Sequence, residues 1–237
     1  MTHGDGAELG TMTWPALWRA APRPVLVVPV GSCEQHGPHL PLDTDTRIAT
    51  ALAEGLVDAF DTGGDGARPI VVAPPLTVTA SGEHGGFPGT LSIGTEVFER
   101  VVVELIRSAD WSGGVVLVNG HGGNAAPVSR AVATVRGEGR RVLSWWPRDP
   151  GGDAHAGATE TSVMLAIAPH LVRRDAVRPG RVEPISTYAD ELRRDGVRAV
   201  SETGVLGDPT TATAAHGRSL LTRWHIDLVA AVDEWWS

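Results

Sequence analysis

Short apolar runs alternate with segments of helical periodicity along most of this sequence. The runs are apolar at nearly every position, as expected for strands buried on both faces. We predict strands at Pro24–Val30, Pro69–Pro75, Gly114–Asn119 and Arg141–Trp146. We predict helices at 14–18, from Thr44 or Asp45 to Phe60, at Thr95–Ala109, 125–136, 155–168 and 209–236, with a Gly-rich turn at 61–68. This alternation favours a mainly parallel sheet with right-handed crossovers and helices on both faces, an α/β fold.

The composition limits both the domain organisation and the classes of function. The 237 residues are enough for one α/β domain, which we expect to span residues 1–237. A net charge of −8 argues against a nucleic-acid partner, because phosphate binding needs clustered basic residues. One cysteine excludes an internal disulfide and a multi-thiolate zinc site. No apolar run reaches the roughly 18–20 residues of a membrane span, and no signal-peptide pattern is present, so we expect a cytoplasmic protein without a membrane partner.

The loop after the first predicted strand is rich in groups that bind metals. It contains Glu34, His36, His39, Asp43 and Asp45, together with prolines and glycines that enforce turns. Burying so many ionisable groups without a partner is costly, and a divalent cation is a natural partner. In an extended segment Glu34 and His36 point to the same side, and a turn can return Asp45 toward them. The alternative is a polar surface loop.

Two more predicted strands end in loops with similar residues. His121 lies between glycines in 120–124, and His155 and Glu160 follow the fourth strand. Ligands of parallel sheets bind beyond the carboxyl ends of the strands, which is where these loops lie. The alternatives are a Gly-rich turn for His121, a backbone-bonded loop histidine for His155, and a dipole-compensating carboxylate for Glu160.

These residues make a two-metal site the best interpretation. Three carboxylates suit two divalent cations better than one, and the imidazoles bind as neutral ligands. We expect Asp45 to bridge the ions, with Glu34 and His121 on one and His36 and Glu160 on the other. Mixed oxygen and imidazole ligands favour zinc or iron(II), with manganese as a further candidate. Two such metals acidify a shared water and polarise a carbonyl group, which is the chemistry of amide hydrolysis.

Other residues receive supporting roles. His155 is the candidate catalytic residue, either as the acid that protonates the leaving nitrogen or as a group that stabilises the tetrahedral intermediate. We expect His39, Asp43 and Asn124 to orient the ligands. Cys33 should face away from Glu34 as a small buried apolar residue rather than act as a nucleophile. The candidates to line a pocket for an aromatic group, or alternatively to serve as core or interface aromatics, are Phe87, Trp145, Trp146 and Tyr188.

Five motifs occur in the order found in one enzyme family: GSCEQHGPHLPLDTD (31–45), GEHGGFPGTLSIG (82–94), NGHGGN (119–124), HAGATETS (155–162) and GDPTTATAAHGR (207–218). Through them the chain resembles the creatininase family of metal-dependent amidohydrolases. The resemblance implies a three-layer α/β/α fold, a dinuclear metal centre, usually a homohexamer, and metal ligands at Glu34, His36, Asp45 and His121. Creatinine-hydrolysing members carry a ligand glutamate where this chain has Gly123, whereas other members use the glutamate that corresponds to Glu160. This departure argues against creatinine itself as the substrate.

Three functions follow from these patterns. The EQHGPHLPLDTDTRIA segment is most similar to a peptidase of the family that releases a modified C-terminal Val-Tyr dipeptide from a ribosomally made precursor peptide. The second is a small-molecule amidohydrolase that opens a lactam or cleaves a formamide. The third is a non-catalytic metal-binding scaffold, against which the complete set of three carboxylates argues.

Overall fold

A computed structural model describes residues 7–60 and 69–237. Within these residues, four strands form one parallel sheet in the order β2-β1-β3-β4. They are β1 (Val25–Val30), β2 (Ile70–Val72), β3 (Gly114–Asn119) and β4 (Val142–Trp145). All four predicted strands are therefore confirmed. The predicted turn at 61–68 lies outside the described residues.

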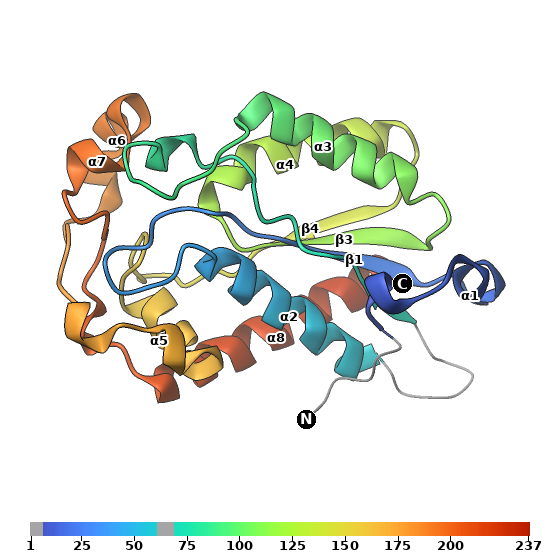
Figure 1. Ribbon diagram of the computed structural model, residues 1–237. Helices are drawn as coiled ribbons and strands as arrows, with labels where there is room; N and C mark the ends of the chain where they lie inside the picture. The colour runs from blue at the N-terminus through green and yellow to red at the C-terminus, as the bar shows by residue number, and fades with distance from the viewer. Residues whose placement is uncertain (1–6, 61–68) are drawn as a thin grey trace.

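Helices cover both faces of the sheet, which confirms the three-layer α/β/α architecture (Figure 1). Helices α3 and α4 lie on one face, and α2, α5 and α8 lie on the other. The helices are α1 (Trp14–Arg19), α2 (Thr44–Phe60), α3 (Thr95–Ser108), α4 (Ala125–Gly137), α5 (Ala158–Ile167), α6 (Ala189–Asp195), α7 (Val197–Val200) and α8 (Ala214–Trp236). The short helices α6 and α7 were not predicted. None of the described helices combines the length and apolar character needed to span a membrane.

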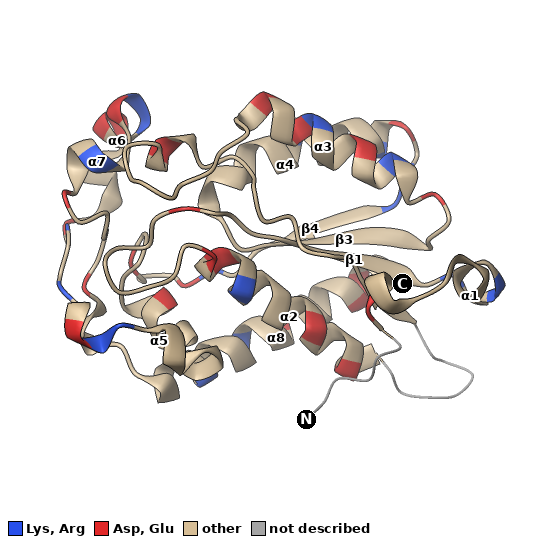
Figure 2. Ribbon diagram, viewed as in Figure 1, with Lys and Arg blue, Asp and Glu red and all other residues tan. Residues whose placement is uncertain are grey.

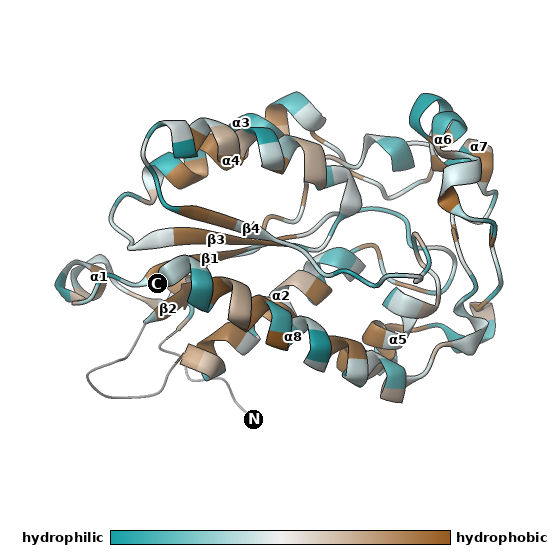
Figure 3. Ribbon diagram, turned by 180° about the vertical axis from the view of Figure 1, so that it is seen from behind, coloured by the Kyte–Doolittle hydropathy of each residue, from teal (hydrophilic) through white to brown (hydrophobic). Residues whose placement is uncertain are grey.

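The all-apolar sequence of β1 is explained by its burial on both faces. Successive side chains of a strand point to opposite sides of the sheet. Leu26 and Val28 accordingly pack with Phe98 of α3, whereas Val25 and Val27 pack in the core that contains α2 and α8. Seen from behind, the sheet strands are largely brown between two helical layers (Figure 3). A strand enclosed in this way has no polar face to alternate with its apolar one.

The centre of the sheet determines where ligand-binding loops can meet. From β1 the sheet continues to β2 on one side and to β3 on the other, and the last residues of β1 and β3, Val30 and Asn119, are paired. Such a switch point opens a crevice beyond the carboxyl ends of the strands. Gly120 allows the two backbones to approach closely at this crevice. A Cβ atom at this position would lie 2.4 Å from the backbone oxygen of Asp45, so only glycine fits without a shift. The loops after β1 and β3 can therefore approach to backbone contact.

Candidate metal centre

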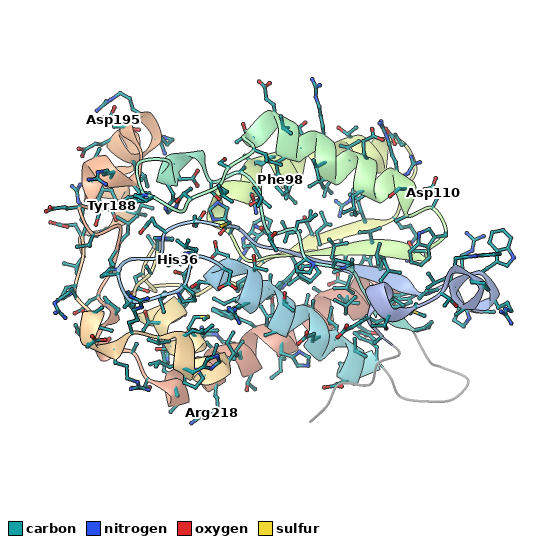
Figure 4. The ribbon with its side chains drawn as sticks, in the orientation of Figure 1. His36, Phe98, Asp110, Tyr188, Asp195 and Arg218 are labelled. Carbon is teal, nitrogen blue, oxygen red and sulfur yellow. The ribbon has the colours of Figure 1, made fainter. Side chains whose placement is uncertain are left out.

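The five predicted metal ligands lie together at this carboxyl edge. Potential ligand atoms of Glu34, Asp45 and His121 lie within 4.8 Å of one another, and the same holds for those of His36, Asp45 and Glu160. Asp45 belongs to both of these groups, as expected for a bridging carboxylate, and a third group joins Glu34 and His36 with His155. Figure 4 places His36 among the loops beyond the strands. All five are buried except Glu160, whose side chain is 21% exposed.

Asp45 directs its two carboxylate oxygens to different histidines. Oδ1 lies 3.0 Å from His36 Nε2, and Oδ2 lies 3.2 Å from His121 Nδ1. The Ser32 hydroxyl donates to Oδ2 at 2.8 Å, an orienting contact that the sequence analysis did not identify. Asp45 is in the first turn of α2, where the helix dipole favours negative charge. Each oxygen of this carboxylate is thus available to one half of the cluster.

Backbone carbonyls fix the orientation of both histidine rings. His36 Nδ1 lies 3.1 Å from the Glu34 carbonyl, and His121 Nε2 lies 3.0 Å from the Ala80 carbonyl. A nitrogen facing a carbonyl must carry the hydrogen, so in the neutral ring the other nitrogen has the free lone pair. Those free nitrogens, Nε2 of His36 and Nδ1 of His121, face the carboxylates. Metal-binding histidines typically have this arrangement.

The Glu34 carboxylate gives the most direct test of whether the cluster fits a metal. Both of its oxygens are fully buried and neither has a hydrogen-bond partner within the described structure. Oε1 lies 3.1 Å from His121 Nδ1 and 3.3 Å from His84 Nε2, close enough for an ion pair but without hydrogen-bond geometry. A buried carboxylate without donors is costly unless a cation neutralises it. The residues therefore fit a divalent cation.

The electrostatic field of the cluster favours positive charge. Burial alone would lower the pKa of His36, but the nearby carboxylates of Asp45, Glu160 and Glu34 together outweigh this, with Asp45 the strongest, and raise the pKa to about 10. Burial raises the pKa of Glu160 to about 7, and the positive charge of His36 only partly opposes it. Protons and metal ions compete for the same atoms, because a ligand must be deprotonated to bind a metal.

Glu160 is held by an unusual turn before α5. The Ala156 backbone N–H donates to Glu160 Oε2 at 2.6 Å, and Ala156 has φ = 52°, in the left-handed region. A non-glycine residue adopts this conformation at an energetic cost, and such residues cluster at functional sites. Asp153 accepts hydrogen bonds from the Ala158 and Thr159 N–H groups and so fixes the start of α5. Local geometry thereby places the Glu160 carboxylate toward the cluster.

His155 lies inside the cluster rather than beside it. Its ring packs on the rings of His36 and His84, with centroids 4.3 and 4.5 Å apart. Its Nε2 lies 2.8 Å from the Gln35 carbonyl oxygen and 3.0 Å from the Gln35 side-chain nitrogen, and its Nδ1 lies 3.8 Å from Glu34 Oε1. Burial, with the nearby histidines, holds the pKa of His155 well below its usual value. The metal-free protein therefore contains a neutral imidazole at this position.

Two of the three residues expected to orient ligands act indirectly. The Asn124 side chain accepts from the Ala80 N–H at 3.2 Å and donates to the Gly31 carbonyl at 2.9 Å, and Ala80 in turn holds His121. His39 Nε2 lies 2.8 Å from the hydroxyl of Thr161, the neighbour of Glu160. Each therefore braces a segment that carries a predicted ligand.

Asp43 corrects the sequence-based expectation. Its side chain is 44% exposed and forms an ion pair with Arg47, with Oδ2 2.7 Å from Nη2. The two residues are four apart at the start of α2 and share one exposed face of that helix. Asp43 therefore stabilises the surface of α2 and does not orient the predicted ligands.

Cys33 partly follows its prediction. It makes no contact with the cluster in the described structure, and its Sγ lies 3.6 Å from the Gly89 carbonyl. However, it is only half-buried, beside Leu91, with which it forms an isolated bridge.

Besides Ser32, three polar residues of the site were not identified from the sequence. Gln35 donates through its side-chain amide to His84 Nδ1 at 2.9 Å, and thereby fixes the ring that faces Glu34. Glu83 Oε1 lies 3.5 Å from His121 Nε2, and a Cβ atom at Gly123 would lie 2.2 Å from that oxygen. Glu83 thus fills the space above Gly123. Glu83 and His84 belong to the 3-10 turn η2 (Gly82–His84), within the 82–94 motif that was used above only for the family resemblance.

A cavity of ≈ 970 Å³ gives access to the cluster. Asp45, His121 and Glu160 form its floor with His155, and residues of η2, α6 and α7 complete its walls. Of the aromatic candidates, Trp146 borders a smaller cavity of ≈ 200 Å³ that also touches His121 and Glu160, and Phe87 borders a third. Trp145 and Tyr188 are buried and line none of these three cavities.

Known proteins resemble the chain over most of its length. It is 54% identical to the "Mycofactocin precursor peptide peptidase" of Mycolicibacterium smegmatis, over 83% of this chain and 79% of that protein. It is 49% identical to the protein of the same name from Mycobacterium tuberculosis, over 96% and 91% of the two chains. Among solved structures, a mutant creatininase of the "Zn-Zn type" superposes with a TM-score of 0.80 at 26% identity, covering 96% of this chain and 97% of that one.

The family assignment agrees with the fold and with the cluster of metal-binding residues. A family model described as creatininase, creatinine amidohydrolase, matches residues 10–232. The chain therefore belongs to the creatininase family.

Proposed function

We propose that this protein is a metal-dependent amide hydrolase that holds two divalent cations in each chain. Glu34 and His121 would bind one ion, His36 and Glu160 the other, and Asp45 both. The observation that carries this proposal is the position of Asp45, which shares one group of potential ligands with Glu34 and a second with Glu160. Zinc and iron(II), separately or as a mixed pair, suit these oxygen and imidazole ligands, and manganese is also compatible.

In this mechanism some residues of the protein would bind the cations, and His155 would transfer protons. The bound cations would supply Lewis acidity, which acidifies a water molecule and polarises the amide carbonyl. His155 accepts a proton at Nδ1 and returns it to the leaving nitrogen. The contact of Nε2 with the Gln35 carbonyl, 2.8 Å, would keep the ring in this orientation during both transfers. Ser32 holds Asp45, and the Ala80 carbonyl holds His121.

We further propose a peptide substrate, the mycofactocin precursor peptide, from which the enzyme releases a modified C-terminal Val-Tyr dipeptide. Identities of 49–54% to peptidases of that name support the substrate class. The ≈ 970 Å³ cavity lies near the upper end of the roughly 300–1,000 Å³ range of small-molecule sites, and so has room for more than one residue. The alternative is a small amide such as a lactam or formamide, and Gly123, in place of the glutamate of creatinine-hydrolysing members, disfavours creatinine.

The proposed enzyme is a single-domain homo-oligomer, with a homohexamer as the specific expectation, and it acts in the cytoplasm where ribosomally made peptides arise. Trp14 and Trp18 on α1 are 75% and 81% exposed, which is consistent with burial against another copy. Light scattering after size exclusion would give the assembly mass relative to the 24.9 kDa chain.

The decisive experiment measures metals and turnover in the same preparation. Protein purified without a histidine tag is analysed for metal content, then assayed before and after chelation on a precursor-like peptide ending in Val-Tyr and on creatinine. We expect about two metals per chain and chelator-sensitive release of the dipeptide. Turnover of only the small amide would select the alternative substrate. Absence of bound metal, with turnover that survives chelation, would contradict the metal-dependent mechanism.

A further inference from the structure

Gln35, which separates the proposed ligands Glu34 and His36 in the sequence, has a buried side-chain amide that takes no part in the proposed hydrolysis. The amide lies beside His84 and His155, whose rings pack with centroids 4.5 Å apart. A primary amide offers an acceptor oxygen and two N–H donors, and burial requires partners for all of them. The partners of Gln35 therefore determine where the hydrogens of the two rings lie.

Two backbone groups fix the orientation of the Gln35 amide. The Gly37 N–H donates to Oε1 at 2.9 Å, and Nε2 donates to the Gly204 carbonyl at 3.1 Å. A backbone N–H only donates and a carbonyl only accepts, so these contacts distinguish the amide oxygen from the nitrogen. One of the two hydrogens on Nε2 is thereby assigned to Gly204, and one remains.

Both of these backbone groups belong to glycines that the packing requires. Gly37 has φ = 65° and Gly204 has φ = 80°, in the left-handed region that glycine adopts readily. A Cβ atom at Gly204 would overlap Gln35 Oε1, and a Cβ atom at Gly37 would lie 2.5 Å from Val205 Cγ2. The backbone is therefore packed closely around this amide.

The remaining hydrogen of Nε2 has two candidate acceptors, His84 Nδ1 at 2.9 Å and His155 Nε2 at 3.0 Å. His155 Nε2 also lies 2.8 Å from the backbone carbonyl of Gln35, and because a carbonyl only accepts, this nitrogen must carry a hydrogen itself. It therefore cannot accept the amide hydrogen, which goes to His84 Nδ1. With Nδ1 as an acceptor, the His84 ring is neutral and carries its hydrogen on Nε2.

The two rings consequently present opposite groups to the Glu34 carboxylate. His84 Nε2, with its hydrogen, lies 3.3 Å from Oε1, whereas Nδ1 of the neutral His155 ring, without one, lies 3.8 Å from the same oxygen. A ring nitrogen that carries a hydrogen has no lone pair for a metal. The geometry agrees, because His155 shares a group of potential ligands with Glu34 and His36, whereas His84 belongs to no such group among the described residues.

We propose that Gln35 is a positioning residue that, through His84, directs a neutral N–H toward Glu34 and keeps His84 from binding the metals. The placement of the hydrogens stands without a metal, whereas its consequence for metal binding rests on the proposed function. His84 lacks hydrogen-bond geometry to Glu34, so both carboxylate oxygens stay open to a cation while the N–H favours their position. Figure 2 shows acidic but no basic colouring on the loop between β1 and α2, so no Lys or Arg of that loop competes for this charge.

The first test uses the metal-free protein and long-range ¹H–¹⁵N NMR of the histidine rings, which identifies the nitrogen that carries each hydrogen. His84→Asn assigns the His84 signals, and the wild type should have hydrogen on Nε2 of both His84 and His155. Gln35→Glu replaces the donor with an acceptor of the same shape, so the His84 hydrogen should move to Nδ1 while His155 is unchanged. Hydrogen on Nδ1 of His84 in the wild type, or an unchanged His84 in Gln35→Glu, overturns the proposal.

A neutral variant keeps the test decisive if Gln35→Glu does not fold. Gln35→Met keeps the length of the side chain but removes both donors, so the Nε2–H form of His84 should no longer be exclusive. Zinc affinity, measured by competition with a chelator, should fall by about 10- to 100-fold. Asp43→Asn, an exposed change in the same loop, should alter neither property.

The outcomes separate this role from the proposed function. Weaker zinc binding in Gln35→Met with His84 still entirely in the Nε2–H form would show a merely structural effect, and unchanged zinc affinity would remove the positioning role; either result overturns the proposal. If the wild type binds no zinc, the proposed function fails, and the NMR comparison still decides whether Gln35 places the hydrogen of His84.

Discussion

At the scale of single residues, the centre consists of carboxylates and imidazoles whose partners are mostly backbone groups or neutral side chains. Ser32 and Ala80 fix Asp45 and His121, but Glu34 is left without a hydrogen bond in the described structure. The proposed ligands are thus oriented while their charge remains available for a cation.

Replacing Glu160 with glutamine should remove one metal per chain and reduce turnover by about 100-fold or more, because the amide keeps the shape but loses the charge of a proposed ligand. Metal analysis and a steady-state assay would measure both effects. Asp43→Asn is the matched control, since this exposed carboxylate pairs only with Arg47 among the described contacts and should keep both metals. Full metal occupancy and activity in Glu160→Gln would reject Glu160 as a ligand.

Ser32→Ala should weaken metal binding by about 10- to 100-fold, because Asp45 loses the hydroxyl that orients Oδ2. Competition with a chelator of known affinity would measure the loss. The fold should tolerate the change at a cost of about 1 kcal/mol. Unaltered metal affinity would show that the two histidines suffice to orient Asp45.

At the scale of elements, the site depends on how closely the loop after β3 approaches the start of α2. Gly120 and Gly122 belong to the same short motif, yet only Gly120 lies against a neighbouring backbone. The sequence alone presents them as equivalent flanks of His121.

Gly120→Ala should destabilise the protein by about 1–3 kcal/mol, because its Cβ atom would lie 2.4 Å from the Asp45 backbone oxygen and force α2 away from β3. Gly122→Ala meets no atom within 4 Å and should change stability by less than about 0.5 kcal/mol. Urea unfolding of the two variants would compare them directly. Equal stabilities would mean that the loop yields at little cost.

The elements that could be predicted are those whose pattern is visible within a short stretch of sequence. β1 is apolar throughout because it is buried on both faces, and Glu34, His36 and Asp45 belong to one short loop directly after it. The roles of η2, α6 and α7 depend instead on tertiary packing, and α6 contains no buried residue that would mark a periodic face. Asp43 was misassigned because sequence proximity to Asp45 does not show that the two side chains leave the helix start in different directions.

At the scale of the whole molecule, buried neutral histidines link stability to pH. Burial lowers the pKa values of His39 and His84 to about 4, below the 6.5 of an exposed imidazole. Between these values the unfolded chain binds more protons at these two histidines than the folded one does, so their contribution to stability is full above about pH 6.5 and falls as the pH approaches 4.

His39→Gln should therefore reduce the acid dependence of unfolding in the metal-free protein, by up to about 1.4 kcal/mol per pH unit between pH 6 and 4. Denaturant unfolding at a series of pH values would measure the slope. Replacement of His216, which is exposed on α8, controls for the loss of a histidine elsewhere. An unchanged slope in His39→Gln would show that other groups carry the acid sensitivity.

The run Glu34-Gln35-His36 has a consequence for how this enzyme can diversify. Its first and third residues are proposed ligands, and the middle one holds His84 in place and supplies the carbonyl that orients His155. An insertion or deletion of one residue here would move the proposed ligands and the supporting residue out of position. We therefore expect few substitutions to be tolerated in this run. The wall formed by α6 and α7 contributes no proposed ligand, and substitutions there leave the chemistry untouched. Sequence differences among related enzymes should therefore accumulate in α6 and α7. New substrates would be acquired by changing these residues, which line the cavity, rather than the proposed metal ligands.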